Sequence, residues 1–153
     1  KRLIIIKPKD PYFTELLGQI YLETGHPKKA ISAFSKALTI MPNEPSFLIW
    51  SAISHLALET SEKNTVALEL LQKAGQLDSI NPRLLRYLAI AYARNSQPGK
   101  AALTTSEYSI ILGRFKAAKM HANQALKTLK PYSIEWRKAQ DIIEISSKIG
   151  ENK

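Results

Sequence analysis

The sequence contains no cysteine, only six glycines among 153 residues, and no long apolar run. The absence of cysteine excludes a disulfide framework and any thiolate nucleophile or thiolate metal ligand. A membrane-spanning helix needs about 20 apolar residues, whereas the longest dense apolar run is Leu3–Ile6. The chain starts at Lys1 and shows no signal-peptide pattern, so we expect it to be a piece of a longer protein.

Motifs that carry catalysis or bind a metal are also missing. His26, His55 and His121 stand apart from one another, without the H-E-x-x-H spacing of a zinc site. The sequence has no phosphate-binding glycine loop, and its carboxylates are scattered singly. We therefore expect no catalytic residue, no metal and no cofactor in this chain. We interpret His26 as a turn residue, His55 as a core residue and His121 as a helix-surface residue.

What the sequence does contain is an internal repeat. The segment Lys7–Pro11 aligns with Met41–Pro45 at an offset of 34 residues, and Met41–Pro45 aligns with Asp78–Pro82 at an offset of 37. Each of these segments ends an apolar stretch and supplies a proline that can open the next helix. A period of this length indicates a repeat architecture.

The first repeat carries the spacing of a known family. The matching residues are Leu17-Gly18-x2-Tyr21, then Ala30-x3-Phe34, then Pro42. This spacing matches the tetratricopeptide repeat (TPR) at six positions, with Thr14 in place of the usual Trp. Because antiparallel helices approach closely only through small side chains, we expect Gly18 to face Ala30 and Ala37.

The sequence thus predicts an all-α fold, a TPR-like α-solenoid of about eight antiparallel helices in stacked helix-turn-helix pairs. We expect helices over residues 12–24, 27–41, 46–59, 63–78, 82–95, 98–112, 114–129 and 133–149. Residues 99–112 could be the second helix of repeat 3 or the first helix of repeat 4. Asp10, Asn81 and Ser133 are the expected N-caps.

The predicted organisation is as follows: residues 1–10, the tail of a truncated preceding repeat; 11–44, repeat 1; 45–81, repeat 2 with a three-residue insertion near Thr60–Lys63; 82–131, degenerate repeats 3 and 4; and 132–153, a C-terminal capping helix. Leu3, Ile4, Ile5 and Ile6 align with the end of a second helix, although a β-strand is the alternative. As a helix tail they would expose apolar side chains to the groove or to another chain, which would permit self-association.

Positive charge is concentrated in the second half of the chain. Residues 82–153 sum to +8, whereas residues 11–81 sum to −2 and residues 1–10 to +3. Stacked TPRs present the first helix of each repeat on a concave, peptide-binding surface. The predicted groove residues are Tyr12, Glu15, Gln19, Ile49, Ile53, Arg83, Arg86, Ile90 and Arg94.

Two interpretations of the arginines remain open. Arg83, Arg86 and Arg94 share one helix face, where they could hold a carboxylate or an acidic peptide by bidentate hydrogen bonds. Alternatively, they are solvated and serve solubility. The basic net charge also suits nucleic acid, but few aromatic residues are interleaved among the lysines at 116, 119, 127 and 130, so we expect no nucleic-acid partner.

A more specific resemblance covers nearly the whole chain. It is carried by Tyr87-Leu88-Ala89-x2-Tyr92-x-Arg94, by Gly99-x-Ala101-Ala102-Leu103, and above all by Ser133-x-Glu135-Trp136-x2-Ala139-Gln140-Asp141-Ile142. These residues resemble the C-terminal region of bacterial gluzincin-type zinc metalloproteases with an appended TPR array, of the β-barrel assembly-enhancing type.

The resemblance implies a periplasmic protein whose catalytic zinc site lies in a protease domain upstream of Lys1. No position in this chain matches that site. The array would pack on the protease domain and bind unfolded outer-membrane proteins or their assembly machinery. The alternative is a free-standing TPR scaffold that assembles a protein complex without a linked protease.

Overall fold

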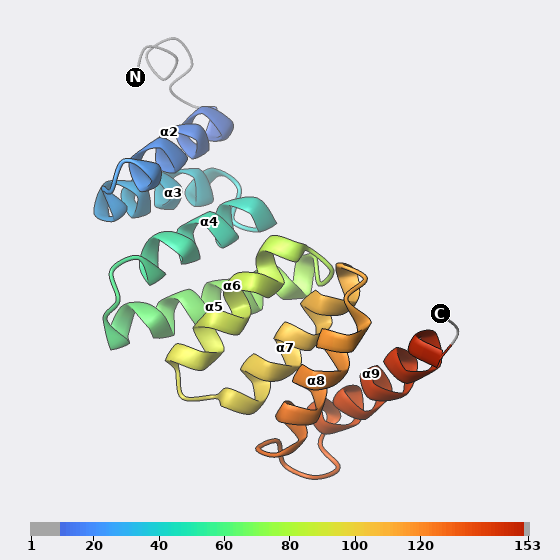
Figure 1. Cartoon of the computed structure of the whole chain (residues 1–153). Coiled ribbons are helices and arrows are strands. Elements are labelled where there is room, and N and C mark those ends of the chain that lie inside the picture. The colour runs from blue at the N-terminus through green and yellow to red at the C-terminus, as the bar shows by residue number, and fades with distance from the viewer. Residues whose placement is uncertain (1–9, 152–153) are drawn as a thin grey trace. The chain divides into compact units, whose positions relative to one another are not determined.

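The computed structural model of the chain describes residues 10–151, which form eight α-helices and no β-strand. The helices are α2 (Pro11–Glu23), α3 (Pro27–Ile40), α4 (Pro45–Leu56), α5 (Ser61–Leu77), α6 (Pro82–Arg94), α7 (Pro98–Ile111), α8 (Phe115–Leu126) and α9 (Ile134–Glu151) (Figure 1). This confirms the predicted all-α class. The predictions for Leu3, Ile4, Ile5 and Ile6 fall outside the described residues.

Local sequence signals decide where the helices begin. The side chain of Asp10 accepts a hydrogen bond from the Tyr12 N–H (3.0 Å), and the side chain of Asn81 accepts one from the Arg83 N–H (3.0 Å). The Ser133 hydroxyl accepts one from the Trp136 N–H (3.2 Å). All three predicted N-caps are therefore confirmed. Proline opens α2, α3, α4, α6 and α7, where its missing N–H costs no helical hydrogen bond.

Two helix ends differ from the prediction by three residues. Helix α4 ends at Leu56, three residues early, because the chain turns at Glu59, which has a φ of +54°. Thr60 then caps α5 by accepting a hydrogen bond from the Lys63 N–H (3.3 Å), so the inserted turn precedes Ser61. Helix α8 ends at Leu126 rather than at 129, and residues 127–133 form the connection to α9.

The chain divides into two compact units, unit 1 ending at Ser79 and unit 2 starting at Ile80. In unit 1, α2 pairs with α3 and α4 pairs with α5, while α3 packs on α4. The aromatic ring of Phe34 lies at the centre of this packing, stacked on the ring of Trp50 with centroids 6.5 Å apart. A Cβ on Gly18 would lie 2.6 Å from Phe34 Cζ, so Gly18 faces this ring and not the alanines expected.

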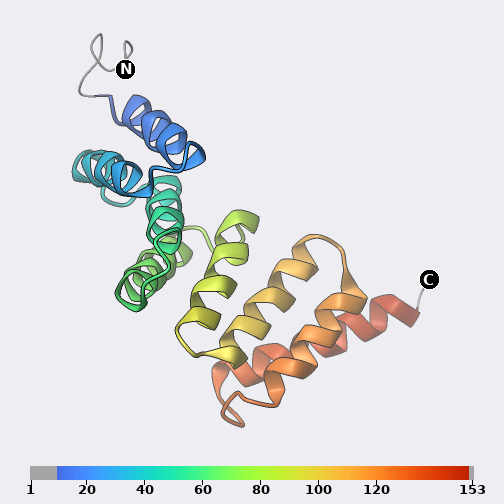
Figure 2. The ribbon, with the colours of Figure 1, turned by 60° about the vertical axis from the view of Figure 1, so that its left-hand side comes forward.

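In unit 2, α7 is the central helix. Helices α6 and α8 both pack on it, and α9 packs on α8 and α7 (Figure 2). The core cluster here consists mainly of alanines on α7, α8 and α9 together with Leu103. These small side chains allow close helix–helix contact.

Three turns share one hydrogen-bond pattern, in which the residue before the next helix donates its N–H to a carbonyl five residues earlier. The bonds are His26 to Tyr21 (2.7 Å), Gln97 to Tyr92 (2.9 Å) and Arg114 to Ser109 (2.8 Å). The preceding residue has positive φ in each turn: +75° at Gly25, +57° at Ser96 and +67° at Gly113. The turn that joins the two helices of repeat 1 therefore also joins α6 to α7 and α7 to α8. Helix α7 follows α6 as the second helix of a repeat would, and it precedes α8 as the first helix of a repeat would.

Candidate functional site

A cleft of about 510 Å³ lies over α7, between α6 and α8. Its position follows from the packing of unit 2, because α6 and α8 each contact α7 and do not contact one another in the part of the chain that the structure describes. The lining residues are Leu85, Arg86, Ala89, Ile90 and Ala93 from α6, Pro98, Ala101, Ala102, Thr105 and Tyr108 from α7, and His121 and Gln124 from α8.

The lining combines small apolar side chains with a cation. Ala89, Ala93 and Ala101 keep the cleft open, since a larger side chain at any of them would fill part of the volume. Arg86 is exposed, and its guanidinium carbon lies 5.6 Å from the centroid of the neighbouring Tyr87 ring. No carboxylate lines the cleft. The arrangement can therefore accept an apolar side chain beside an anionic group.

The structure separates the predicted arginine row. Arg86 and Ile90 line the cleft, whereas Arg83 and Arg94 are exposed on α6 outside its lining. The cleft side of α6 is instead marked by Ala89 and Ala93. Sequence reasoning missed these alanines, together with Tyr108 and His121, although the spacing of four residues between Ala89 and Ala93 was a usable signal.

The predicted groove residues of unit 1 differ in exposure: Tyr12 is exposed, whereas Glu15 and Gln19 are half-buried. Tyr12 is 55% exposed and meets the ring of Phe47 edge-on, with centroids 5.6 Å apart. Glu15 accepts hydrogen bonds from Gln19 Nε2 (3.2 Å) and Ser46 Oγ (2.9 Å), so these polar positions form one network.

Ile49 and Ile53 are buried, with 2% and 8% of their surface exposed. The structure therefore places these two predicted groove residues in the core of unit 1. Helix α4 is buried on most of its circumference.

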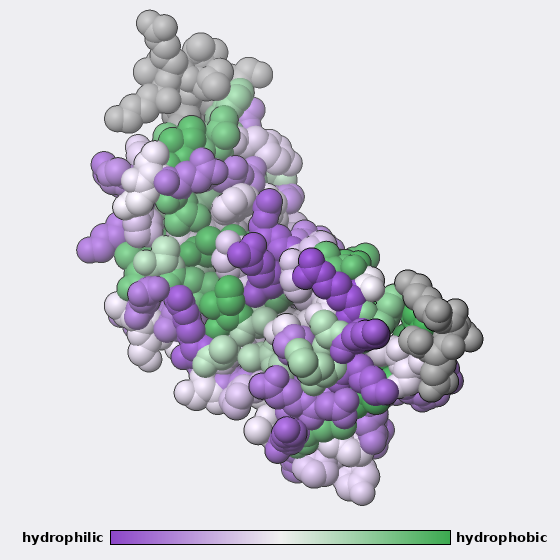
Figure 3. Space-filling model, in the orientation of Figure 1, coloured by the Kyte–Doolittle hydropathy of each residue, from purple (hydrophilic) through white to green (hydrophobic). Residues whose placement is uncertain are grey.

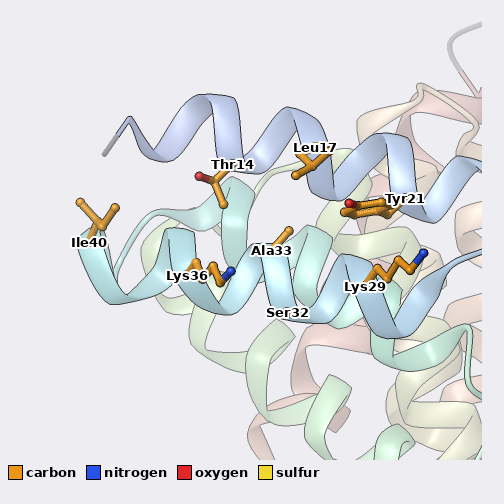
Figure 4. Close-up of a pocket in the computed structure, with 8 residues that line it drawn as sticks. All are labelled: Thr14, Leu17, Tyr21, Lys29, Ser32, Ala33, Lys36 and Ile40. Carbon is orange, nitrogen blue, oxygen red and sulfur yellow. The ribbon is translucent and has the colours of Figure 1, made fainter. Parts of the chain in front are cut away.

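A second, smaller cleft of about 340 Å³ lies between α2 and α3. Thr14, Leu17 and Tyr21 of α2 point toward α3, and Lys29 and Lys36 stand on the opposite side (Figure 4). Lys29 Nζ lies 5.8 Å from the Tyr21 ring centroid, which is within cation–π range. The cleft combines an apolar interior with two ammonium groups.

Two titratable groups in the interior have shifted pKa values. Burial lowers the pKa of His55, and the nearby Lys63 lowers it further. His55 Nδ1 is buried without a hydrogen-bond partner, but the residue as a whole is half-buried, at the edge of the core in which it was expected. Burial raises the pKa of Glu107, and Lys138, with its Nζ 3.8 Å from the carboxylate, partly opposes that shift.

The described residues contain no group of three or more histidine or acidic side chains placed to hold a metal ion. None of their helices is both long and apolar enough to span a bilayer.

Comparison with known proteins places this arrangement in the class of TPR-like α-solenoids. Residues 13–44 match the tetratricopeptide repeat family. The crystal structure of MamA superposes with a TM-score of 0.67 at 16% identity, covering 96% of this chain and 86% of that chain. A second crystal structure of MamA protein gives 0.66 at 16% identity, covering 95% and 79%.

A third similar structure is TTC0263, a thermophilic TPR protein in Thermus thermophilus. It has a TM-score of 0.59 at 14% identity, with 93% of this chain and 86% of that chain covered. No curated protein sequence matches this chain. The structural likeness confirms the predicted TPR-like fold.

Proposed function

We propose that this chain is a non-catalytic protein-interaction domain that binds an acidic segment of a partner protein in the cleft over α7. The observation that carries the proposal is the lining of that cleft, which joins small apolar side chains to the exposed guanidinium of Arg86 and contains no carboxylate. TPR-like solenoids offer surfaces of this kind to peptide ligands.

Binding would combine two physical contributions. An apolar ligand side chain that enters beside Ala89 and Ala101 loses its contact with water, which is favourable in proportion to the area buried. A ligand carboxylate next to Arg86 receives a charge-assisted hydrogen bond, which is about twice as strong as a neutral one. An acidic segment that also carries an apolar residue satisfies both.

The test uses fluorescein-labelled peptides that carry Asp and Glu around a single Leu, with Lys-containing versions as the charge-reversed probe. We expect Arg86→Ala to weaken binding of the acidic peptide about tenfold, because a hydrogen bond to a charged group contributes about 1.5–3 kcal/mol. Arg83→Ala is the matched control on the same helix. This variant should bind the acidic peptide with the same affinity as the unaltered chain.

A second variant tests the location without changing charge. Ala93 is exposed and lines the cleft, so Ala93→Leu should reduce the cleft volume and weaken binding while the thermal midpoint stays unchanged. Equal effects of Arg83→Ala and Arg86→Ala, or tight binding by Ala93→Leu, would place the peptide elsewhere.

We further propose that the parent protein is a periplasmic zinc metalloprotease and that this domain supplies its client or partner binding. The resemblance centred on Ser133–Ile142 supports this, and zinc would be held by the upstream domain. Reading the encoded sequence before Lys1 tests the proposal, because an H-E-x-x-H helix and a signal peptide are expected there. Their absence would favour the free-standing scaffold that assembles a protein complex.

A further inference from the structure

The connection between α8 and α9 presents two large apolar side chains to solvent. Tyr132 is 76% exposed and Ile134 is 74% exposed, the two highest values among the large apolar residues from Pro82 onward. The Tyr132 ring packs against the Trp136 ring, with centroids 5.2 Å apart and planes tilted by 48°. Together they form an apolar tip at one end of unit 2.

This tip is held in place by its surroundings. A Cβ on Gly99 would lie 2.8 Å from Thr128 Oγ1 and 2.9 Å from Leu129 Cδ2, so the connection packs closely on the start of α7. Leu129 also packs against the alanine core of unit 2. Ser133 closes the turn by donating its N–H to the Lys130 carbonyl (3.2 Å). The tip is therefore presented on a fixed base and not on a loose loop.

The backbone at the tip is also unusual. Tyr132 has a φ of +63°, a region that residues other than glycine rarely adopt. An aromatic residue that is both in this conformation and largely exposed gains little burial to offset the strain. Such a conformation at an exposed site is a reason to look for a function there.

The stretch of chain that leads to the tip carries charge of one sign. From Tyr108 to Ile134 the sequence has no Asp or Glu, and its cations are Arg114, Lys116, Lys119, Lys127 and Lys130. Hydrophilic side chains cover much of the visible face of α8 (Figure 3). The next carboxylate, that of Glu135, lies 4.0 Å from Lys100 Nζ and is partly balanced by it.

From these observations we infer that the tip docks on an anionic lipid surface. Tyr and Trp side chains favour the headgroup level of a bilayer, where an aromatic ring is buried and its polar atom stays hydrated. Ile134 would enter the acyl boundary, while Lys127 and Lys130 pair with anionic headgroups. An aliphatic side chain at the centre of the tip favours lipid over nucleic acid, whose bases offer stacking faces to aromatic rings.

The two parts of the tip are expected to act together. Two apolar side chains bury too little area for stable attachment to a neutral bilayer, in the same way that a single lipid anchor gives only marginal binding. The lysines supply the second attraction, which salt screens. Binding should therefore be reversible, require anionic lipid and weaken as salt is added.

The experiment measures co-sedimentation of the full chain with phosphatidylcholine vesicles that contain or lack phosphatidylglycerol. We expect binding only with phosphatidylglycerol. Tyr132→Ser with Ile134→Ser should lower partitioning about tenfold or more, since each buried apolar side chain contributes separately. Lys127→Ser with Lys130→Ser should lower it about fivefold for each lysine.

A matched control and a second measurement keep the result interpretable. Ile145→Ser replaces an exposed isoleucine of α9 outside the tip and should leave partitioning unchanged. Quenching of tryptophan fluorescence by lipids brominated along the acyl chain should follow vesicle binding and disappear in the tip double variant. Arg86→Ala should not alter vesicle binding, so failure here is distinguishable from failure of the proposed peptide site.

Three results would overturn the inference. Equal binding to neutral vesicles would remove the role of the lysines. Unchanged partitioning of the tip double variant, with its circular dichroism spectrum intact, would remove the role of Tyr132 and Ile134. Binding to a generic RNA or DNA duplex that is as tight as binding to vesicles, and equally sensitive to the tip variants, would identify a nucleic acid as the partner.

Discussion

Both units bury alanines between their helices, but unit 1 also buries several large side chains, whereas the described residues of α7, α8 and α9 in unit 2 bury only Leu103 of that kind. The fully buried large residues of unit 1 include Phe34, Phe47, Leu48, Ile49 and Leu71. The buried residues of α7, α8 and α9 include Ala102, Ala118, Ala122, Ala125, Ala139, Thr104, Ser106 and Ser109. Large side chains fill the space between helices, whereas small side chains let the helices approach more closely. Unit 1 should therefore be most sensitive to truncation, and unit 2 to enlargement.

The largest expected effect is the truncation of Phe34 in unit 1. Its ring is fully buried, lies over Gly18 and stacks on Trp50. We expect Phe34→Ala to lower the free energy of unfolding by about 3–5 kcal/mol, because both the burial and the contacts around the resulting cavity are lost. Urea denaturation followed by circular dichroism measures this. Phe115→Ala, at the partly exposed start of α8, should cost less; an equal cost would remove the contrast between the units.

The matching test in unit 2 enlarges a core alanine. Ala122 is fully buried in the cluster formed by α7, α8 and α9. Ala122→Leu should destabilise the chain by about 1–3 kcal/mol, since the added atoms push the helices apart. The exposed Ala93 is the control, because Ala93→Leu adds the same atoms next to an open cleft. A neutral Ala122→Leu variant would show that the alanine packing is loose.

Local signals made much of the fold predictable. Asp10 and Asn81 cap their helices, and the prolines after them fix the first turn, so each start depends on only a few neighbouring residues. The end of α4 could not be predicted in this way, because the chain turns at Glu59 without a glycine or proline to mark the position.

The candidate site was only partly predictable, for a different reason. Arg86 and Ile90 were found because they share one helix face. Tyr108 and His121 were not, because the cleft depends on how α6 and α8 pack on α7. Gly18 shows the same limit: its pattern indicated a close contact, but the identity of the partner, Phe34, depended on tertiary packing.

A smaller effect is expected from the buried hydroxyl groups of unit 2. Ser106 Oγ donates a hydrogen bond to the carbonyl of Ala118 (2.8 Å), which links α7 to α8. Ser106→Ala should lower the free energy of unfolding by about 1 kcal/mol. Ser109 instead donates to the carbonyl of Thr105 in its own helix (2.8 Å), so Ser109→Ala should cost less. The reverse order would mean that the link between the helices contributes nothing.

The smallest effect concerns the carboxyl group of Glu107 in unit 2. Burial favours its neutral form by raising its pKa, whereas burial favours the neutral form of His55 in unit 1 by lowering its pKa. Burial raises the pKa of Glu107, so the folded chain holds that proton to a higher pH than the unfolded chain does. The resulting stabilisation is complete below the ordinary glutamate pKa of about 4.3 and is lost as pH rises through the folded-state pKa. Glu107→Gln should remove this dependence, changing the free energy of unfolding by less than about 1 kcal/mol near neutral pH.

Thermal midpoints of the unaltered chain and of Glu107→Gln, measured across mildly acidic pH, test this pH dependence. Glu144→Gln is the control of opposite sign, because the Lys148 hydrogen bond lowers the pKa of Glu144, and any stabilisation it gives is lost as pH falls. Lys138→Ser adds a sharper test. The nearby ammonium group opposes the shift at Glu107, so its removal should move the pH window upward. A window that stays in place would show that Lys138 does not influence this carboxylate, and that the interior of unit 2 alone sets its pKa.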